Sequence, residues 1–188
     1  MIVKIRNEEK ETENTVEVKN EYNLTIKYIY EDGKQAAETY TETLTPEASY
    51  NVESPKIEGY KADKTVVQGE MPFSDVEETV VYTKRNDLGY TIHYKEQGTN
   101  KKLAEDKVVT NKEFDEVITE DAIDIEGYNK VDPTSAEIKI TTGTNEHTFY
   151  YTKRDDLEYT IHYKEQGTNA KLAEDKVVTN KEFDEVIT

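Results

Sequence analysis

The chain has no cysteine and no tryptophan, and only 4 prolines among its 188 residues. Without cysteine it can form no disulfide bond, no cysteine-ligated zinc site and no thiol nucleophile. No hydrophobic run approaches the roughly 20 residues of a membrane span, so we expect no membrane insertion. Neither a signal peptide at the start nor an anchoring tail at the end is recognisable. If the protein is extracellular, we therefore expect this chain to be an internal piece of it.

Basic residues are also scarce. The chain has 24 Lys and Arg residues against 41 Asp and Glu residues, which gives a formal net charge of −17. Nucleic acids and anionic membrane surfaces bind clustered Lys and Arg, so we expect neither as a partner. A strong negative charge is more typical of an extended surface molecule, which it keeps in solution.

Tyrosine is abundant, with 14 residues against 4 phenylalanines, although hydrophobic residues make up only 34% of the chain. Such a composition suits several thin domains better than one large core. A tyrosine ring can pack inward in a thin domain while its hydroxyl reaches the edge.

The clearest feature of the sequence is a repeat. Residues 90–119 and 159–188 differ only at Lys101 and Ala170, with a period of 159 − 90 = 69 residues. A more distant copy precedes them, because Thr25–Tyr28 resembles Thr91–Tyr94 and Ile57–Tyr60 is identical to Ile125–Tyr128. The predicted divisions are 1–21, the end of an upstream domain or a lead-in strand; 22–86, repeat 1; 87–155, repeat 2; and 156–188, a truncated repeat 3.

Within each repeat, apolar and polar residues alternate with a period of two. The alternation is visible in Leu24–Tyr28, Tyr90–Tyr94 and Ala136–Ile140, and it predicts half-buried β-strands. Residues 111–118 are ambiguous and predict either a short helix or a turn that leads into another strand. The fold class is therefore mainly β or α+β. Because the linkers between repeats are short and charged, we expect the repeats to stack end to end in an elongated rod.

These motifs resemble the MucBP (mucin-binding protein) repeat of Gram-positive cell-surface adhesins. Repeat 1 carries the pattern as LTIKYIYEDGK at 24–34, PKIEGY at 55–60, GEMPFSD at 69–75 and VVYTK at 80–84. The resemblance implies ubiquitin-like, β-grasp-type repeats of a protein at the bacterial cell surface, anchored to the cell wall in its full-length form. It also implies adhesion to mucin or another host glycoprotein, and it brings no catalytic residues.

Three functions follow from this resemblance. The first is a stalk or adhesion module that projects, or contributes to, host binding. The alternatives are a dedicated mucin or glycan receptor, in which many weak sites gain avidity, and a purely structural spacer. In each case we expect a monomer whose nearest partners are the neighbouring repeats of the same chain.

Serine and histidine give no support for catalysis. No serine has the glycine framing of a nucleophile elbow. His93 and His162 occupy the same position in two copies, on the polar face of a predicted strand. We therefore expect no enzyme activity.

The candidate ligand-binding residues are Tyr60 and Tyr128, each of which follows a glycine in the I-E-G-Y element. Their rings could stack on sugars, but aromatic residues at matching positions of a repeat more often belong to the core.

An acidic cluster gives a candidate metal site at Glu120, Asp121, Asp124 and Glu126. Hard oxygen ligands suit calcium, and weak calcium sites occur in extracellular modules. The alternative is an ordinary solvated face. No other cofactor is expected, and no buried Lys–Asn–acid trio is evident for an isopeptide bond.

Overall fold

A computed structural model describes residues 2–5, 14–17 and 19–186 of the chain, and the side chains from residue 19 onward. In this described part all regular elements are strands, so it contains no helix that could cross a membrane. The chain divides into two compact units, Met1–Arg85 and Asn86–Thr188. The division falls one residue before the expected start of repeat 2 at residue 87.

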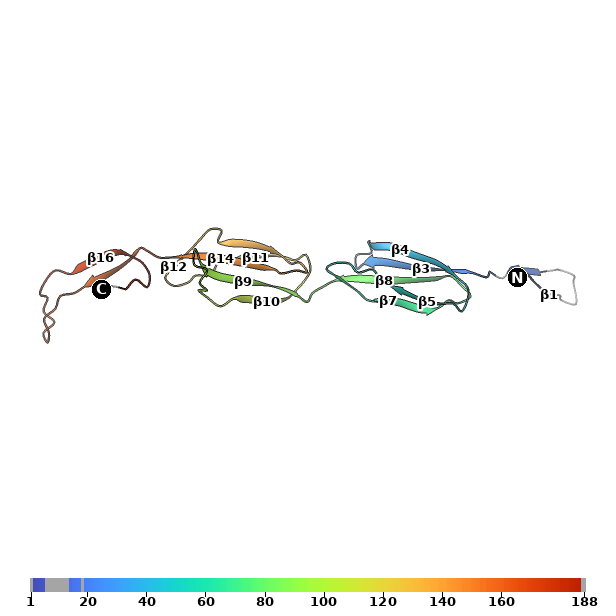
Figure 1. The fold of residues 1–188 in the computed structure, drawn as a ribbon, viewed down its shortest axis with the longest axis horizontal. Helices are drawn as coiled ribbons and strands as arrows, with labels where there is room; N and C mark the ends of the chain where they lie inside the picture. The colour runs from blue at the N-terminus through green and yellow to red at the C-terminus, as the bar shows by residue number, and fades with distance from the viewer. Residues whose placement is uncertain (1, 6–13, 18, 187–188) are drawn as a thin grey trace. The chain divides into compact units, whose positions relative to one another are not determined.

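The first unit contains a short hairpin and repeat 1 (Figure 1). In repeat 1, four strands form one sheet in the order β4-β3-β8-β6, and two more strands form a separate pair, β5-β7. The central strands β3 and β8 run parallel, and the other neighbours run antiparallel. The strand bounds are β1 (Ile2–Ile5), β2 (Asn14–Glu17), β3 (Tyr22–Tyr30), β4 (Gln35–Leu44), β5 (Ser49–Glu53), β6 (Tyr60–Ala62), β7 (Val66–Glu70) and β8 (Val76–Lys84).

Repeat 2, in the second unit, has the same topology. Its sheet order is β10-β9-β14-β12, with β9 and β14 parallel at the centre, and β11 pairs with β13. Repeat 3 contributes one hairpin, β15-β16. The strand bounds are β9 (Leu88–Glu96), β10 (Lys107–Lys112), β11 (Val117–Asp121), β12 (Tyr128–Lys130), β13 (Ser135–Lys139), β14 (Glu146–Lys153), β15 (Leu157–Ile161) and β16 (Lys176–Lys181).

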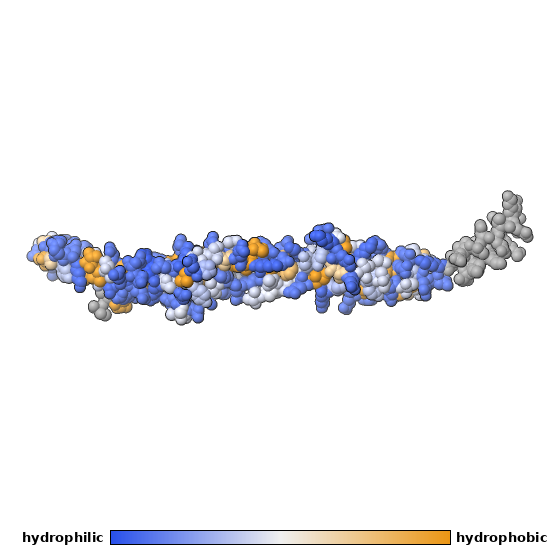
Figure 2. Space-filling view, turned by 90° about the horizontal axis from the view of Figure 1, so that it is seen from above, coloured by the Kyte–Doolittle hydropathy of each residue, from blue (hydrophilic) through white to orange (hydrophobic). Residues whose placement is uncertain are grey.

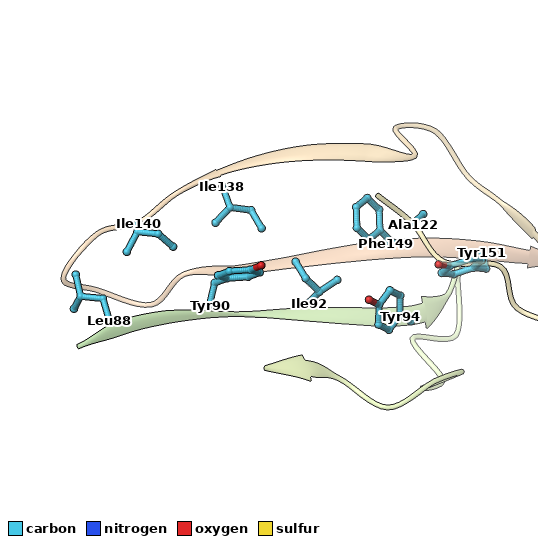
Figure 3. Close-up of a cluster of buried hydrophobic side chains, with 9 residues drawn as sticks. All are labelled: Leu88, Tyr90, Ile92, Tyr94, Ala122, Ile138, Ile140, Phe149 and Tyr151. Atoms are coloured by element: carbon cyan, nitrogen blue, oxygen red, sulfur yellow. The ribbon is translucent and has the colours of Figure 1, made fainter. Parts of the chain in front are cut away.

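Each complete repeat buries one apolar core between its larger sheet and its strand pair. In β9 every second residue is buried, as the alternating sequence predicts. Figure 3 shows these β9 side chains meeting residues of the facing strands. The core of repeat 1 is Leu24, Ile26, Tyr28, Val67, Met71, Val80 and Tyr82; that of repeat 2 is Leu88, Tyr90, Ile92, Tyr94, Ala122, Ile138, Ile140, Phe149 and Tyr151.

The core tyrosines reach the edge of each repeat through their hydroxyl groups. The Tyr82 hydroxyl donates a hydrogen bond to the Pro55 carbonyl at 2.6 Å, and the Tyr151 hydroxyl donates one to the Ile123 carbonyl at 3.0 Å. Both carbonyls lie just before the I-E-G-Y turn. Burial raises the pKa of Tyr151 to about 12.

The half repeat at the end of the chain buries less apolar surface, as expected for a repeat that lacks its returning strand. Tyr94 of repeat 2 is 3% exposed, whereas the equivalent Tyr163 of repeat 3 is 41% exposed. Figure 2 shows a visible face that is mostly hydrophilic with separated hydrophobic patches, in line with the high charge.

The alternative of a helix at residues 111–118 is wrong. β10 continues to Lys112, a turn follows, and β11 begins at Val117. Asp115 in this turn has a φ of 66°, which a helix does not allow. The spacing of Phe114, Val117 and Ile118 imitates a helical face, but Val117 is exposed while Ile118 packs against the core.

The mainly β class is confirmed, and the β-grasp arrangement is not. A hairpin leads into a crossover and a strand that returns parallel to the first, as the resemblance implies. In the described residues, however, the crossover carries the strand pair β5-β7 or β11-β13, and no helix lies across the sheet.

Candidate functional site

The I-E-G-Y element forms the same tight turn in both complete repeats. The Tyr60 amide donates to the Ile57 carbonyl at 3.1 Å, and the Tyr128 amide donates to the Ile125 carbonyl at 3.1 Å. The glycine before each tyrosine has positive φ, 78° in repeat 1 and 80° in repeat 2. Glycine adopts this conformation without steric cost, so the turn needs it.

The turn places each tyrosine as the first residue of a short edge strand. Tyr60 begins β6 opposite Lys84, and Tyr128 begins β12 opposite Lys153. The two candidate ligand-binding residues therefore hold equivalent positions at the edge of the larger sheet.

Tyr60 is half-buried and packs against the core of repeat 1. Its ring lies 4.7 Å from the ring of Tyr30, with an angle of 48° between the planes. The aromatic surface of Tyr60 is thus partly engaged within its own repeat.

Tyr128 is likewise half-buried against the core of repeat 2. Its ring also meets Phe183 of repeat 3 edge-on, with 5.8 Å between the ring centres and an angle of 63°. Both tyrosines therefore have structural contacts, and ligand binding by their exposed parts stays a prediction.

The four acidic residues of the candidate metal site do not assemble. In the described residues no group of three or more His, Cys, Asp or Glu side chains is placed to hold a metal ion. Glu120 points into repeat 2 and is 9% exposed, whereas Asp124 pairs with Lys130 at 2.8 Å on the surface. Calcium binding stays a prediction from the sequence that this arrangement does not favour.

Glu120 instead takes part in a polar cluster with Tyr90 and Lys107, which the sequence had not indicated. The Lys107 ammonium donates to both carboxylate oxygens of Glu120 at 2.7 Å, and the Tyr90 hydroxyl donates to one of them. Burial by itself raises the pKa of Glu120, but the hydrogen bonds from Lys107 and Tyr90 outweigh it and hold the pKa below its ordinary value. Burial and the bond to Glu120 raise the pKa of Tyr90 to about 12.

Two of the three histidines, His93 and His162, lie in carboxylate pairs. His93 lies 3.2 Å from Asp106, and His162 repeats the pair with Asp175 at 2.9 Å. The hydrogen bond from His93 lowers the pKa of Asp106. This is an ordinary strand-to-loop contact that recurs with the repeat.

Taken together, these features define a protein of tandem β-repeats, in which the recurring residues make structural contacts within and between the repeats. A family model described as the MucBP domain matches residues 23–83 and 91–152. The chain belongs to the MucBP domain family. This is a family of repeats of Gram-positive surface adhesins rather than of enzymes, so the chain is an extracellular repeat region.

One curated relative and two solved structures are similar to this chain. Internalin I of Listeria monocytogenes is 32% identical over 163 residues, which cover 83% of this chain and 9% of Internalin I. A solved MucBP domain from Lactobacillus acidophilus is 26% identical and covers 35% of this chain and 91% of its own, with a TM-score of 0.28. Streptococcal SHIRT domains 3–4 from a cell surface protein are 15% identical and cover 71% of this chain and 98% of their own, with a TM-score of 0.27.

Proposed function

We propose that this chain is a stalk and adhesion module of a cell-wall-anchored surface protein, which projects, or contributes to, a region that binds mucin or another host glycoprotein. The observation that carries the proposal is the match of both complete repeats to the MucBP domain. Internalin I, of which the matched region covers 9%, is a far longer protein, so this chain corresponds to a small part of it.

Within the proposal, the stalk role is better supported than the receptor role. The rings of Tyr60 and Tyr128 are half-buried and contact other aromatic residues, as core and joint residues do. A stacking platform for a sugar needs an open ring face. A receptor remains the second candidate because the same tyrosine recurs at the same sheet edge in both repeats.

The test is binding of the 188-residue protein to immobilised mucin and to a glycan array. The stalk proposal predicts no saturable binding, or binding that the double variant Tyr60→Ala/Tyr128→Ala leaves unchanged. The matched control is Tyr150→Ala, because Tyr150 is also partly exposed, at 38%, but lies outside the I-E-G-Y turns.

Saturable binding that the double variant abolishes and the control retains would replace the stalk by a receptor. In that case each repeat carries one weak site and tandem copies add avidity. Circular dichroism of the variants shows whether they keep their β-structure, so that lost binding is not confused with unfolding.

A further inference from the structure

Two turns from successive repeats meet in the second unit. Phe183 of repeat 3 lies against the turn at Gly127–Tyr128 of repeat 2. The Phe183 amide donates a hydrogen bond to the Arg154 carbonyl at 2.8 Å. Beside it, the Lys153 ammonium lies 3.2 Å from a carboxylate oxygen of Glu182. The aromatic contact thus joins the two turns, and the hydrogen bond and the ion pair join the turn of repeat 3 to the end of β14 and the residue after it.

The fit at Gly127 is close. A Cβ atom added to Gly127 would overlap the ring of Phe183, so only a residue without a side chain fits here. Gly98 and Gly167 also have positive φ, at 85° and 91°, but a Cβ atom there would meet nothing within 4 Å. At Gly127 the ring of Phe183 therefore imposes a second requirement for glycine, in addition to that of the turn.

Phe183 stands at a position of the turn that recurs in all three repeats. Glu47, Asp115 and Asp184 are equivalent turn residues with φ values of 66°, 66° and 61°. The residue before them is Phe in repeats 2 and 3 and Pro46 in repeat 1.

We propose that the Glu182–Asp184 turn is a docking turn for the I-E-G-Y turn of the preceding repeat, and that the two form an inter-repeat joint. The partner that this surface fits is a turn of the form Glu-Phe-Asp in a following repeat. Phe183 supplies the apolar contact, and Glu182 forms an ion pair with Lys153. The joint does not depend on any binding of mucin.

The first test is NMR spectroscopy of the 188-residue protein. One α-proton of Gly127 faces the ring of Phe183, so its resonance is expected well upfield of the other glycines. The amide of residue 183 is expected to exchange slowly with solvent because it is bonded to Arg154. In Phe183→Ala the Gly127 resonance returns to the ordinary range, and exchange at residue 183 accelerates about tenfold or more.

A matched pair of glycine variants isolates the joint. Gly127→Ala and Gly98→Ala both place a Cβ atom at positive φ, but only the first meets the ring of Phe183. We expect Gly127→Ala to accelerate exchange at residue 183 about tenfold and Gly98→Ala to leave it unchanged. In a Phe183→Ala background, Gly127→Ala has no further effect on that exchange, because the two residues act through one contact.

The proposal is overturned if, in the unaltered protein, the Gly127 α-protons resonate in the ordinary range and residue 183 exchanges at the unprotected rate. It is also overturned if Gly98→Ala accelerates exchange at residue 183 as much as Gly127→Ala does. The resonances of Ile92 and Phe149 in the core of repeat 2 report whether each variant is folded.

Discussion

Glu120 is the one charged side chain that repeat 2 buries among its described residues. An ionised carboxylate in this position is stable only because Lys107 and Tyr90 donate hydrogen bonds to it. Repeat 1 has uncharged residues at the positions equivalent to Lys107 and Glu120. By strand register, Lys107 faces Ile92 as Tyr40 faces Ile26 in repeat 1, and Val52 stands where Glu120 does.

The variant Lys107→Met is expected to destabilise the protein by about 1–3 kcal/mol at pH 7, because it removes the charged donor and leaves the buried carboxylate less compensated. The native pKa of Glu120 lies below its ordinary value, so this stability is present above about pH 4 and is lost as the pH falls through the native pKa. The difference between the two proteins in the free energy of unfolding should therefore shrink as the pH falls through the native pKa of Glu120.

Denaturant unfolding from pH 7 to pH 3 measures this difference. The control is the triple variant Tyr90→Leu/Lys107→Tyr/Glu120→Val, which installs the uncharged residues of repeat 1 at these positions. Its free energy of unfolding should lack the pH dependence that protonation of Glu120 causes. A penalty for Lys107→Met that does not change as the carboxylate becomes protonated would show that the variant loses packing of the lysine stem rather than the interaction with the carboxylate.

At the scale of the element, the turn between β10 and β11 is held by its backbone conformation. Asp115 adopts positive φ, and its amide donates to the Ile140 carbonyl at 2.9 Å. Residues other than glycine and, to a lesser degree, asparagine and aspartate adopt this conformation at a cost of about 1 kcal/mol or more.

We expect Asp115→Ala to be less stable than Asp115→Gly by about 1 kcal/mol. Both variants lose the ion pair between Asp115 and Lys139 equally, so their difference reports the backbone: the strain of alanine at positive φ less the additional conformational entropy that glycine loses on folding. Thermal or urea unfolding of the two variants gives the value. Equal stabilities would mean that the turn relaxes to negative φ when the aspartate is removed.

The sequence was a good guide to the strands and a poor one to this turn. Alternation along β3 and β9 has a physical cause, one buried face, that leaves its period in the sequence. Nothing in the residues around Asp115 distinguishes a turn with positive φ from the start of a helix, since Phe, Val and Ile at spacings of three and four suit both. The decision comes from the pairing of β11 with β13, which is a contact between distant residues.

For the candidate site, too, the sequence predicted the local features and missed the contacts between distant residues. The I-E-G-Y repetition correctly predicted that Tyr60 and Tyr128 hold equivalent positions, because the glycine and the turn are local features. The contact of Tyr128 with Phe183 joins residues 55 positions apart, and the cluster of Tyr90, Lys107 and Glu120 spans three strands. Only a comparison of the repeats position by position, with Leu24, Tyr40 and Val52, could have indicated that cluster.

At the scale of the whole molecule, the chain combines a net charge of −17 with two well-formed apolar cores. Among the side chains that the structure describes, Glu120 is the one buried acidic group, and many of the other acidic residues pair with lysines that are themselves exposed. Such pairs are worth little individually, so the stability of each repeat is carried by the core tyrosines and aliphatic residues.

The parallel pair at the centre of each repeat has a mechanical consequence. β3 opens repeat 1 and β8 closes it, and because they run parallel, the start of one and the end of the other lie at opposite ends of the pair. A pulling force on the two ends of the repeat therefore loads the hydrogen bonds from Leu24 to Tyr30 in shear, all at once. A force that separates β3 from the antiparallel β4 at their open ends breaks bonds one after another.

Single-molecule pulling on repeat 1 should therefore show a higher rupture force through Tyr22 and Lys84 than through Tyr22 and Leu44. Because the chain has no cysteine, single cysteines introduced at these positions give unique attachment points. Equal forces in the two geometries would contradict the argument. If the forces differ as expected, a repeat of this kind resists flow at a bacterial surface along its own length, in the direction in which a tethered cell pulls.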